Sequence, residues 1–151
     1  MISTKVLNIQ CFYLSDMYQE IILRDLGRPR RQDFETDVTW MCDSFGFSSG
    51  RDIDKVSRDV VLQLIGDTAK YGMTSPENIA RELQTNVQKI NYHLRSLNES
   101  RFIYRKRGQV FLRADSMKSA VEELRDDANR IFDRLSKIAE EIDDNLGLNQ
   151  K

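Results

Sequence analysis

Residues 86 to 98 combine hydrogen-bond donors, hydrogen-bond acceptors and an aromatic ring in one short segment. Its polar residues with this chemistry are Asn86, Gln88, Lys89, Asn91, Tyr92, His93 and Arg95. A basic run follows at Arg105, Lys106 and Arg107. Because side-chain amides and guanidinium groups can read base edges, and cations neutralise phosphates, we expect all of these residues to contact double-stranded DNA. Asn91 and Arg95 are the best candidates for sequence reading, since asparagine pairs with adenine and arginine with guanine.

Two helices joined by a short turn are predicted to position this segment. Ser75 or Thr74 can cap the first helix, because Pro76 and Glu77 suit a first helical turn. Asn86 can cap the second helix. The second helix has an apolar face with spacings of +3, +4 and +3, made by Val87, Ile90, Leu94 and Leu97. That face should be buried, which leaves the polar side chains on the opposite face.

A β-hairpin is predicted to carry the basic run. Phe102-Ile103-Tyr104 and Val110-Phe111-Leu112 are two β-prone stretches separated by polar residues and Gly108. The helix, turn, helix and hairpin together predict a winged helix-turn-helix, with the hairpin as the wing.

A family resemblance rests on the run Ile90-Asn91-Tyr92-His93-Leu94-Arg95-Ser96-Leu97, followed by Phe102-Ile103 and the basic turn. It resembles the V-S-x-H-L-x-x-L recognition helix and the wing of ArsR-like winged-helix regulators. More widely, residues 34 to 146 resemble predicted archaeal winged helix-turn-helix transcriptional regulators. The resemblance implies a DNA-binding domain that regulates transcription.

The sequence departs from the family pattern in two respects. Gln84 and Arg101 stand where the family usually has glycine, which we expect to alter the geometry of both loops. In addition, neither Cys11 nor Cys42 lies in the motif, so the thiolate metal site of the family has no counterpart. Metal sensing of that type is therefore not expected.

Charge is distributed unevenly along the chain. The whole sequence has a formal net charge of −1, which by itself argues against a nonspecific nucleic-acid binder. Residues 81 to 113, however, hold eight basic residues and two acidic ones, a formal charge of +6. Residues 1 to 80 carry −3 and residues 114 to 151 carry −4. Such a basic segment within an acidic chain is typical of a protein that neutralises phosphates at one face.

A long C-terminal helix is predicted over residues 115 to 147, with Asp115 or Ser116 as its cap and Gly147 at its end. Its apolar residues alternate spacings of +4 and +3, and they are Met117, Val121, Leu124, Ala128, Ile131, Leu135, Ile138 and Ile142. This heptad pattern predicts a coiled coil, for which the same helix of a second chain is the simplest partner. The alternative is that the helix folds back on the N-terminal helices of its own chain.

The N-terminal part is predicted to be a helical extension, residues 1 to 50, ahead of a winged-helix domain, residues 51 to 114. Apolar spacing predicts helices over 33 to 46 and 51 to 70. Val6 to Leu14 could be a strand, but the apolar residues up to Leu26 favour a helix. Gly27-Arg28-Pro29-Arg30-Arg31 is predicted to be a charged linker, although it also resembles the minor-groove arm of an AT-hook.

No catalytic pattern accompanies these residues. The single histidine, His93, lies in the predicted recognition helix, and the chain has no glycine-rich phosphate loop, nucleophile elbow or paired-carboxylate signature. The acidic pairs of the C-terminal helix are most simply a solvated face. We therefore expect no enzyme activity, no metal and no cofactor.

The sequence also bears on compartment and small-molecule binding. No run of about 18 apolar residues and no signal-peptide pattern occurs, which predicts a soluble, cytoplasmic protein. Its two cysteines are predicted to be reduced core residues, with a redox role for Cys42 as the alternative. Trp40, Phe45 and Phe47 could line an effector pocket or belong to the core.

These observations predict a mainly α protein that acts as a homodimeric transcription regulator on a pseudo-palindromic operator. The recognition helix would enter the major groove, and the wing would contact the backbone or the minor groove. The alternative is a winged-helix module that binds another protein of a transcription or scaffold assembly without reading DNA.

Overall fold

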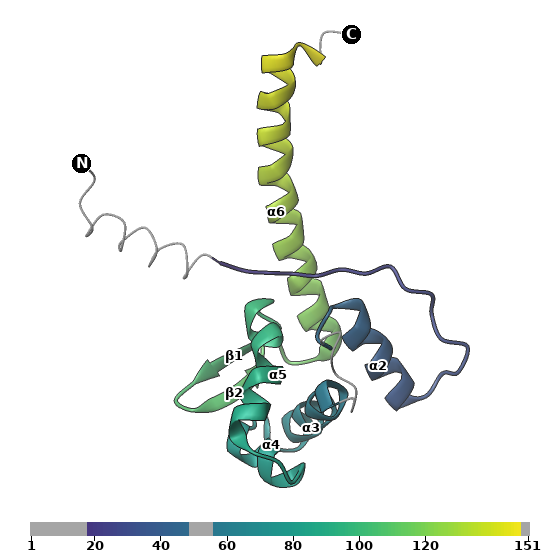
Figure 1. Cartoon of the computed structure of the whole chain (residues 1–151), viewed down its shortest axis with the longest axis vertical. Coiled ribbons are helices and arrows are strands. Elements are labelled where there is room, and N and C mark those ends of the chain that lie inside the picture. Colours follow the sequence, from purple (N-terminus) through teal and green to yellow (C-terminus); the bar gives the residue numbers. More distant parts are fainter. Residues whose placement is uncertain (1–17, 49–55, 149–151) are drawn as a thin grey trace, which may run out of the picture. The chain divides into compact units, whose positions relative to one another are not determined.

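The computed structural model describes residues 18–48 and 56–148 (Figure 1). This part of the chain is mainly helical, with one two-stranded antiparallel hairpin and a long C-terminal helix, so the predicted fold class is confirmed at this level. Its elements are α2 (Phe34–Ser44), α3 (Val56–Tyr71), α4 (Pro76–Glu82), α5 (Val87–Glu99), β1 (Ile103–Lys106), β2 (Gln109–Leu112) and α6 (Met117–Leu146). The chain divides into two compact units, Met1–Arg113 and Ala114–Lys151.

Side-chain caps begin four of the helices, as the sequence predicts for three of them. In each case the side-chain oxygen accepts from the backbone N–H three residues later, which satisfies a donor that the helix itself cannot use. The caps are Asp33 for α2, Ser75 for α4, Asn86 for α5 and Ser116 for α6. At α2 the amide of Thr36 donates to Asp33 and lowers the pKa of that carboxyl group. Thr74 and Asp115, the alternative caps, are not used.

The core of the first unit lies between α3, α4, α5 and the hairpin, which Figure 1 shows packed beside one another. Its fully buried side chains come from every one of these elements, and they include Val60, Leu64, Ile79, Ile90, Leu94, Leu97, Ile103 and Val110. The apolar face predicted for α5 is therefore the buried one, although Val87 at its start is only half-buried. Two backbone hydrogen bonds between Thr74 and Val110, of 2.9 and 2.7 Å, fix the hairpin to the loop that precedes α4.

Three phenylalanine rings extend this core towards α2. Phe47 lies 5.3 Å from Phe45 and 5.2 Å from Phe102 between ring centroids, and Phe47 is 3% exposed. Cys42, on the inner face of α2, is 1% exposed. Phe47 and Cys42 are therefore buried core residues, whereas Trp40 and Phe45 are half-buried. Cys11 lies outside the described residues.

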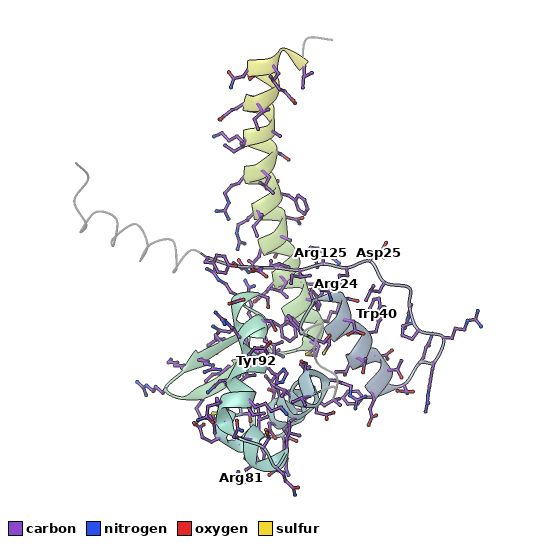
Figure 2. The ribbon with its side chains drawn as sticks, viewed as in Figure 1. Arg24, Asp25, Trp40, Arg81, Tyr92 and Arg125 are labelled. Carbon is purple, nitrogen blue, oxygen red and sulfur yellow. The ribbon has the colours of Figure 1, made fainter. Side chains whose placement is uncertain are left out.

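Residues 18 to 26 form an extended segment, which corrects the predicted helix for this part of the N-terminus. The Glu20 amide donates to the carbonyl of Glu99 at 3.0 Å, and the Arg24 amide donates to that of Ser44 at 2.8 Å. Both acceptors are the last residues of helices, whose carbonyls have no partner within the helix. The indole N–H of Trp40, which is labelled in Figure 2, donates to the Leu26 carbonyl at 3.3 Å. These long-range bonds favour an extended backbone over the local helix that periodicity suggests. The rest of that prediction, residues 1 to 17, lies outside the described part.

Helix and strand boundaries otherwise follow the sequence closely. Residues 51 to 55, predicted to begin the helix that ends at Tyr71, lie outside the described residues. The strands are shifted relative to the prediction, because Arg105 and Lys106 belong to β1 and only Arg107 and Gly108 form the turn. Lys106 pairs with Gln109 across that turn.

Within the described part of the chain, left-handed backbone occurs at three residues that are not glycine. Gln84, Arg101 and Arg107 have φ angles of 56°, 66° and 53°. Gln84 and Arg101 therefore keep the conformation that glycine favours, and the expected change of loop geometry is not seen in their backbone angles. The cost of this conformation is roughly 1–2 kcal/mol for a residue with a side chain.

Replacing Gln84 with glycine should therefore stabilise the first unit. Relief of the left-handed strain outweighs the greater freedom of glycine in the unfolded chain, so we expect a gain of about 0.5–1 kcal/mol in the free energy of unfolding. Urea denaturation followed by circular dichroism measures this gain. Gln84→Ala is the matched control, because alanine keeps the strain. A glycine variant no more stable than the alanine variant would show that this loop is not strained.

Candidate nucleic-acid interface

The outer face of α5 carries most of the residues predicted to contact DNA. Gln88, Lys89, Asn91, Tyr92 and Arg95 are all exposed, and Tyr92, labelled in Figure 2, is 60% exposed. Asn86 is exposed as well, but its side-chain oxygen accepts the Lys89 amide at 2.8 Å as the helix cap. Its Nδ2 amino group is the part of the cap residue that could donate to a phosphate oxygen. Six of the seven residues predicted between Asn86 and Arg95 are therefore exposed.

His93 lies on the other face of α5 and is 8% exposed. Its Nδ1 atom lies 2.9 Å from the hydroxyl oxygen of Ser57 on α3, and its ring meets Tyr92 edge-on at 5.3 Å. The prediction that His93 contacts DNA is therefore not supported by its position. A histidine in this apolar repeat supports the packing of α5 on α3, and the buried neighbours Ile90, Leu94 and Leu97 were the signal that it shares their face.

The hairpin presents the second group of predicted residues. Arg105, Lys106 and Arg107 are exposed, together with Gly108. Arg107 and Gly108 both have positive φ, which is the two-residue turn that suits a tight antiparallel hairpin. Asparagine or glycine is the usual residue at the first position of such a turn, so an arginine there accepts backbone strain. As a result, a cation lies in the turn of the hairpin.

A hydrogen bond joins the hairpin to α5. The Nη2 group of Arg105 donates to Oδ1 of Asn91, with 2.9 Å between the two atoms. Because a guanidinium group can only donate, the oxygen of the Asn91 amide must face Arg105, and the NH₂ group must face away. The basic hairpin and the best candidate for base reading are therefore physically coupled, which the sequence alone did not reveal.

Arg95, the other candidate for base reading, is paired with a carboxylate. Arg95 pairs with Glu99 one turn later, with 3.2 Å between Nε and Oε1. A hollow of about 410 Å³ beside this pair is also lined by Tyr18 and Glu20 of the extended N-terminal segment. The Tyr18 hydroxyl donates to the Glu20 carboxylate, which raises the pKa of Tyr18. Any anion that binds Arg95 must therefore compete with Glu99.

Tyr104 is an exposed residue of this surface that the sequence prediction missed. It lies 47% exposed on β1, and its ring stacks on Phe111 of β2 with centroids 5.1 Å apart and planes 10° from parallel. The signal was the alternation of β1, in which Ile103 is buried and Tyr104 must point outward with Lys106. The outer face of the hairpin therefore combines an aromatic pair with Lys106.

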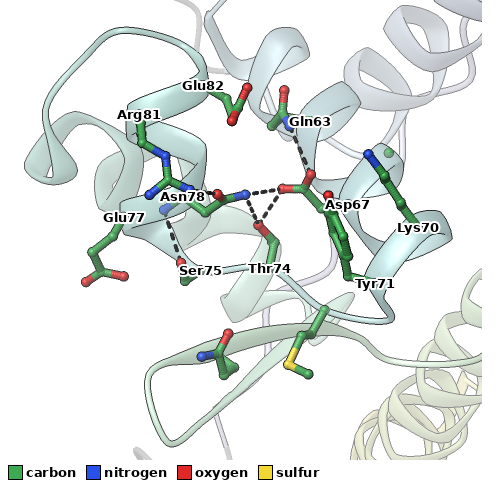
Figure 3. A pocket seen from close by; sticks show the side chains of 13 residues that line it. Gln63, Asp67, Lys70, Tyr71, Thr74, Ser75, Glu77, Asn78, Arg81 and Glu82 are labelled. Atoms are coloured by element: carbon green, nitrogen blue, oxygen red, sulfur yellow. Dashed lines mark hydrogen bonds between the residues drawn. The ribbon is translucent and has the colours of Figure 1, made fainter.

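A buried carboxylate orients α4 against α3. Asp67 is 6% exposed, and it accepts hydrogen bonds from Gln63 at 3.0 Å, Thr74 at 2.6 Å and Asn78 at 2.9 Å (Figure 3). The four side chains line a polar hollow of about 740 Å³. Because Asn78 belongs to α4 and Thr74 holds the hairpin, this network sets the positions of both elements.

Asp67→Ala should therefore destabilise the first unit strongly. The substitution leaves the Thr74 hydroxyl and the Asn78 amide without their acceptor, so we expect a loss of roughly 2–4 kcal/mol in the free energy of unfolding. Thermal or urea denaturation measures the loss. Asp59→Ala on the same helix is the control, because its partly exposed pair with the adjacent Arg58 should contribute less than about 1 kcal/mol. Equal effects of the two substitutions would show that the network does not orient α4.

The predicted seam of α6 differs in exposure along its length. Leu124 is buried, and Val121, Ala128 and Ile131 are half-buried. Leu135, Ile138 and Ile142 are each more than half exposed. The helix runs to Leu146 with a left-handed Gly147 at its end, as predicted. In the described part of the chain, the second half of the seam is therefore not covered by other residues.

Within the described ranges, 18–48 and 56–148, no cluster of three histidine, cysteine, aspartate or glutamate residues could hold a metal ion, and no helix is long and apolar enough to cross a membrane. Comparison of the chain with protein-family models, with curated proteins and with solved structures gives no match.

Proposed function

We propose that this chain is a DNA-binding transcriptional regulator, built on a winged helix-turn-helix, that acts as a homodimer on a pseudo-palindromic operator. In this proposal α4 and α5 form the helix-turn-helix, α5 enters the major groove, and the hairpin is a wing on the backbone or the minor groove. The α6 helices join the two subunits, because their exposed apolar seam needs a partner.

One observation carries the proposal most directly. The exposed donors of α5 and the three cations of the hairpin occupy neighbouring elements, and Arg105 is hydrogen-bonded to Asn91 between them. This surface lies in the segment of formal charge +6, whereas the segments before and after it are acidic. A helix and hairpin that only faced solvent would be expected to carry charges of both signs instead of this concentration of cations and amides. Phosphate binding at one face accounts for that distribution.

The roles of individual residues follow from their surroundings. Lys89, Lys106 and Arg107 are exposed cations suited to phosphates, and Arg105 has further guanidinium donors for a phosphate beside its bond to Asn91. Asn91 presents its NH₂ group while Arg105 holds its oxygen, so it would donate to a base acceptor in this arrangement. Arg95 would bind the edge of a guanine base after its ion pair with Glu99 is broken. We also propose, as the sequence predicts, that the protein is an ArsR-like archaeal regulator and is cytoplasmic.

Duplex binding across a salt series tests the proposal. If Lys89 and the three hairpin cations each neutralise one phosphate, the logarithm of the association constant should fall with the logarithm of salt concentration with a slope of about −3 to −4 per subunit. Fluorescence anisotropy of a labelled duplex measures this slope. Binding that does not depend on salt, or no binding at low salt, would contradict DNA recognition and favour a protein-interaction module.

A further inference from the structure

The second half of α6 presents an uncovered apolar face. Leu135, Ile138 and Ile142 are 58%, 52% and 51% exposed, and Phe132 beside them is 61% exposed. All four lie in a well-formed helix that continues to Leu146. A contiguous apolar face of this kind marks an interaction surface rather than a solvated one.

Charges along the same stretch are ordered. Residues 130 to 137 hold three basic residues and one acidic one, a formal charge of +2. Residues 138 to 146 hold four acidic residues and no basic one, a formal charge of −4. Two parallel copies would set the −4 segments against each other. Two antiparallel copies that cross near residue 136 would set residues 138 to 143 of each chain, with a formal charge of −3, against residues 130 to 135 of the other, with a formal charge of +1, which is attractive.

We propose that a second copy of this chain covers the face, with the two α6 helices antiparallel and a two-fold axis between Leu135 and Ile138. The inference rests on the homodimer of the proposed function and specifies its geometry. In this register Leu135 of each chain packs against Ile138 of the other, and Ile131 packs against Ile142. Four apolar residues of each chain are thereby paired with one another.

The residues that flank the seam fit the same register. In an antiparallel pair related by a two-fold axis, each flank of the seam is lined by the same heptad position from both chains. On one flank, Arg134 of each chain then lies opposite Glu141 of the other chain. On the other flank, Phe132 of each chain lies opposite Ala139 of the other chain. A parallel pair would instead set Arg134 opposite Ala139 and Glu141 opposite Leu146. Only the antiparallel arrangement pairs both the opposite charges and the exposed aromatic ring.

Cysteine cross-linking tests the direction of pairing. Ile131→Cys chains and Ile142→Cys chains, mixed under mild oxidation, should form a disulfide-linked heterodimer. Each variant alone should cross-link no faster than the wild-type chain, which retains Cys11 and Cys42, because two Ile131 positions would lie about 16 Å apart along the helices. Either variant cross-linking to itself as fast as the mixture would overturn the antiparallel arrangement, and so would the absence of cross-links in the mixture.

A charge-transposed variant gives an independent test without new cysteines. Arg134→Glu combined with Glu141→Arg preserves both attractive pairs in an antiparallel homodimer but creates two repulsive pairs with the wild-type chain. Mixed chains should therefore sort into homodimers, with a heterodimer fraction below about one fifth by native mass spectrometry instead of the statistical half. A heterodimer fraction of one half would overturn the inference.

Failure of the antiparallel arrangement in these two tests can be distinguished from failure of the proposed function. Random mixing with intact dimers would refute the antiparallel register and leave the homodimer standing. A monomer at every concentration would refute the register and the homodimer together. Neither experiment contains DNA, so salt-dependent duplex binding is decided separately.

Discussion

Replacing Arg105, Lys106 and Arg107 with alanine is expected to lower duplex affinity on the order of a hundredfold at about 0.1 M salt. The salt slope should fall by about 3 units per subunit, because roughly one unit is lost with each phosphate contact. All three side chains are exposed, and the hairpin is held by the buried residues Ile103 and Val110, so the variant should remain folded. Anisotropy titrations at several salt concentrations measure both effects.

The matched control removes three cations from another exposed part of the chain. Arg28, Arg30 and Arg31 in the linker are exposed, and their replacement by alanine changes the net charge by the same amount. The control should retain nearly the full salt slope. If the linker variant loses the slope and the hairpin variant keeps it, the phosphate contacts lie in the AT-hook-like linker and the hairpin is not a wing.

A second large effect is expected from two aspartates in the α6 seam. Ile131→Asp combined with Leu135→Asp places charges at the centre of the apolar face, and burying them against a second chain would cost several kcal/mol. We expect a monomer by sedimentation velocity at concentrations where the wild-type chain is dimeric. The monomer should also show about half of the wild-type salt slope on a long duplex, because only one interface is then engaged at a time.

Asn129→Asp combined with Ser136→Asp is the control for charge. Both positions are exposed and lie off the seam, so this variant carries the same two added charges but should remain a dimer. If the seam variant also remains dimeric, the two chains do not meet along α6, and the partner of the exposed face is a different molecule.

Local features of the structure could be read from the sequence. The caps at Asn86 and Ser116, the end of α6 at Gly147 and the buried face of α5 all depend on residues within one or two turns of each other. Side-chain capping and a 3.6-residue period act over that range, so their signal survives without knowledge of the fold.

Features that depend on distant residues could not be read in the same way. The extended course of residues 18 to 26 follows from hydrogen bonds to Glu99 and Ser44, and a short apolar segment carries no signal for partners so far along the chain. The burial of His93 follows from α3 packing against α5, where Ser57 meets its ring. The bond between Arg105 and Asn91 likewise depends on how the hairpin folds against the helix.

The most direct test of the central claim is an amide chemical-shift titration of the ¹⁵N-labelled chain with a short duplex at low salt. DNA recognition by this surface predicts the largest shift changes at residues 86 to 95 and 105 to 108, and small changes in α2 and in the second half of α6. Changes concentrated in the linker from residue 27 to 31 or in α6, with α5 and the hairpin unaffected, would contradict it.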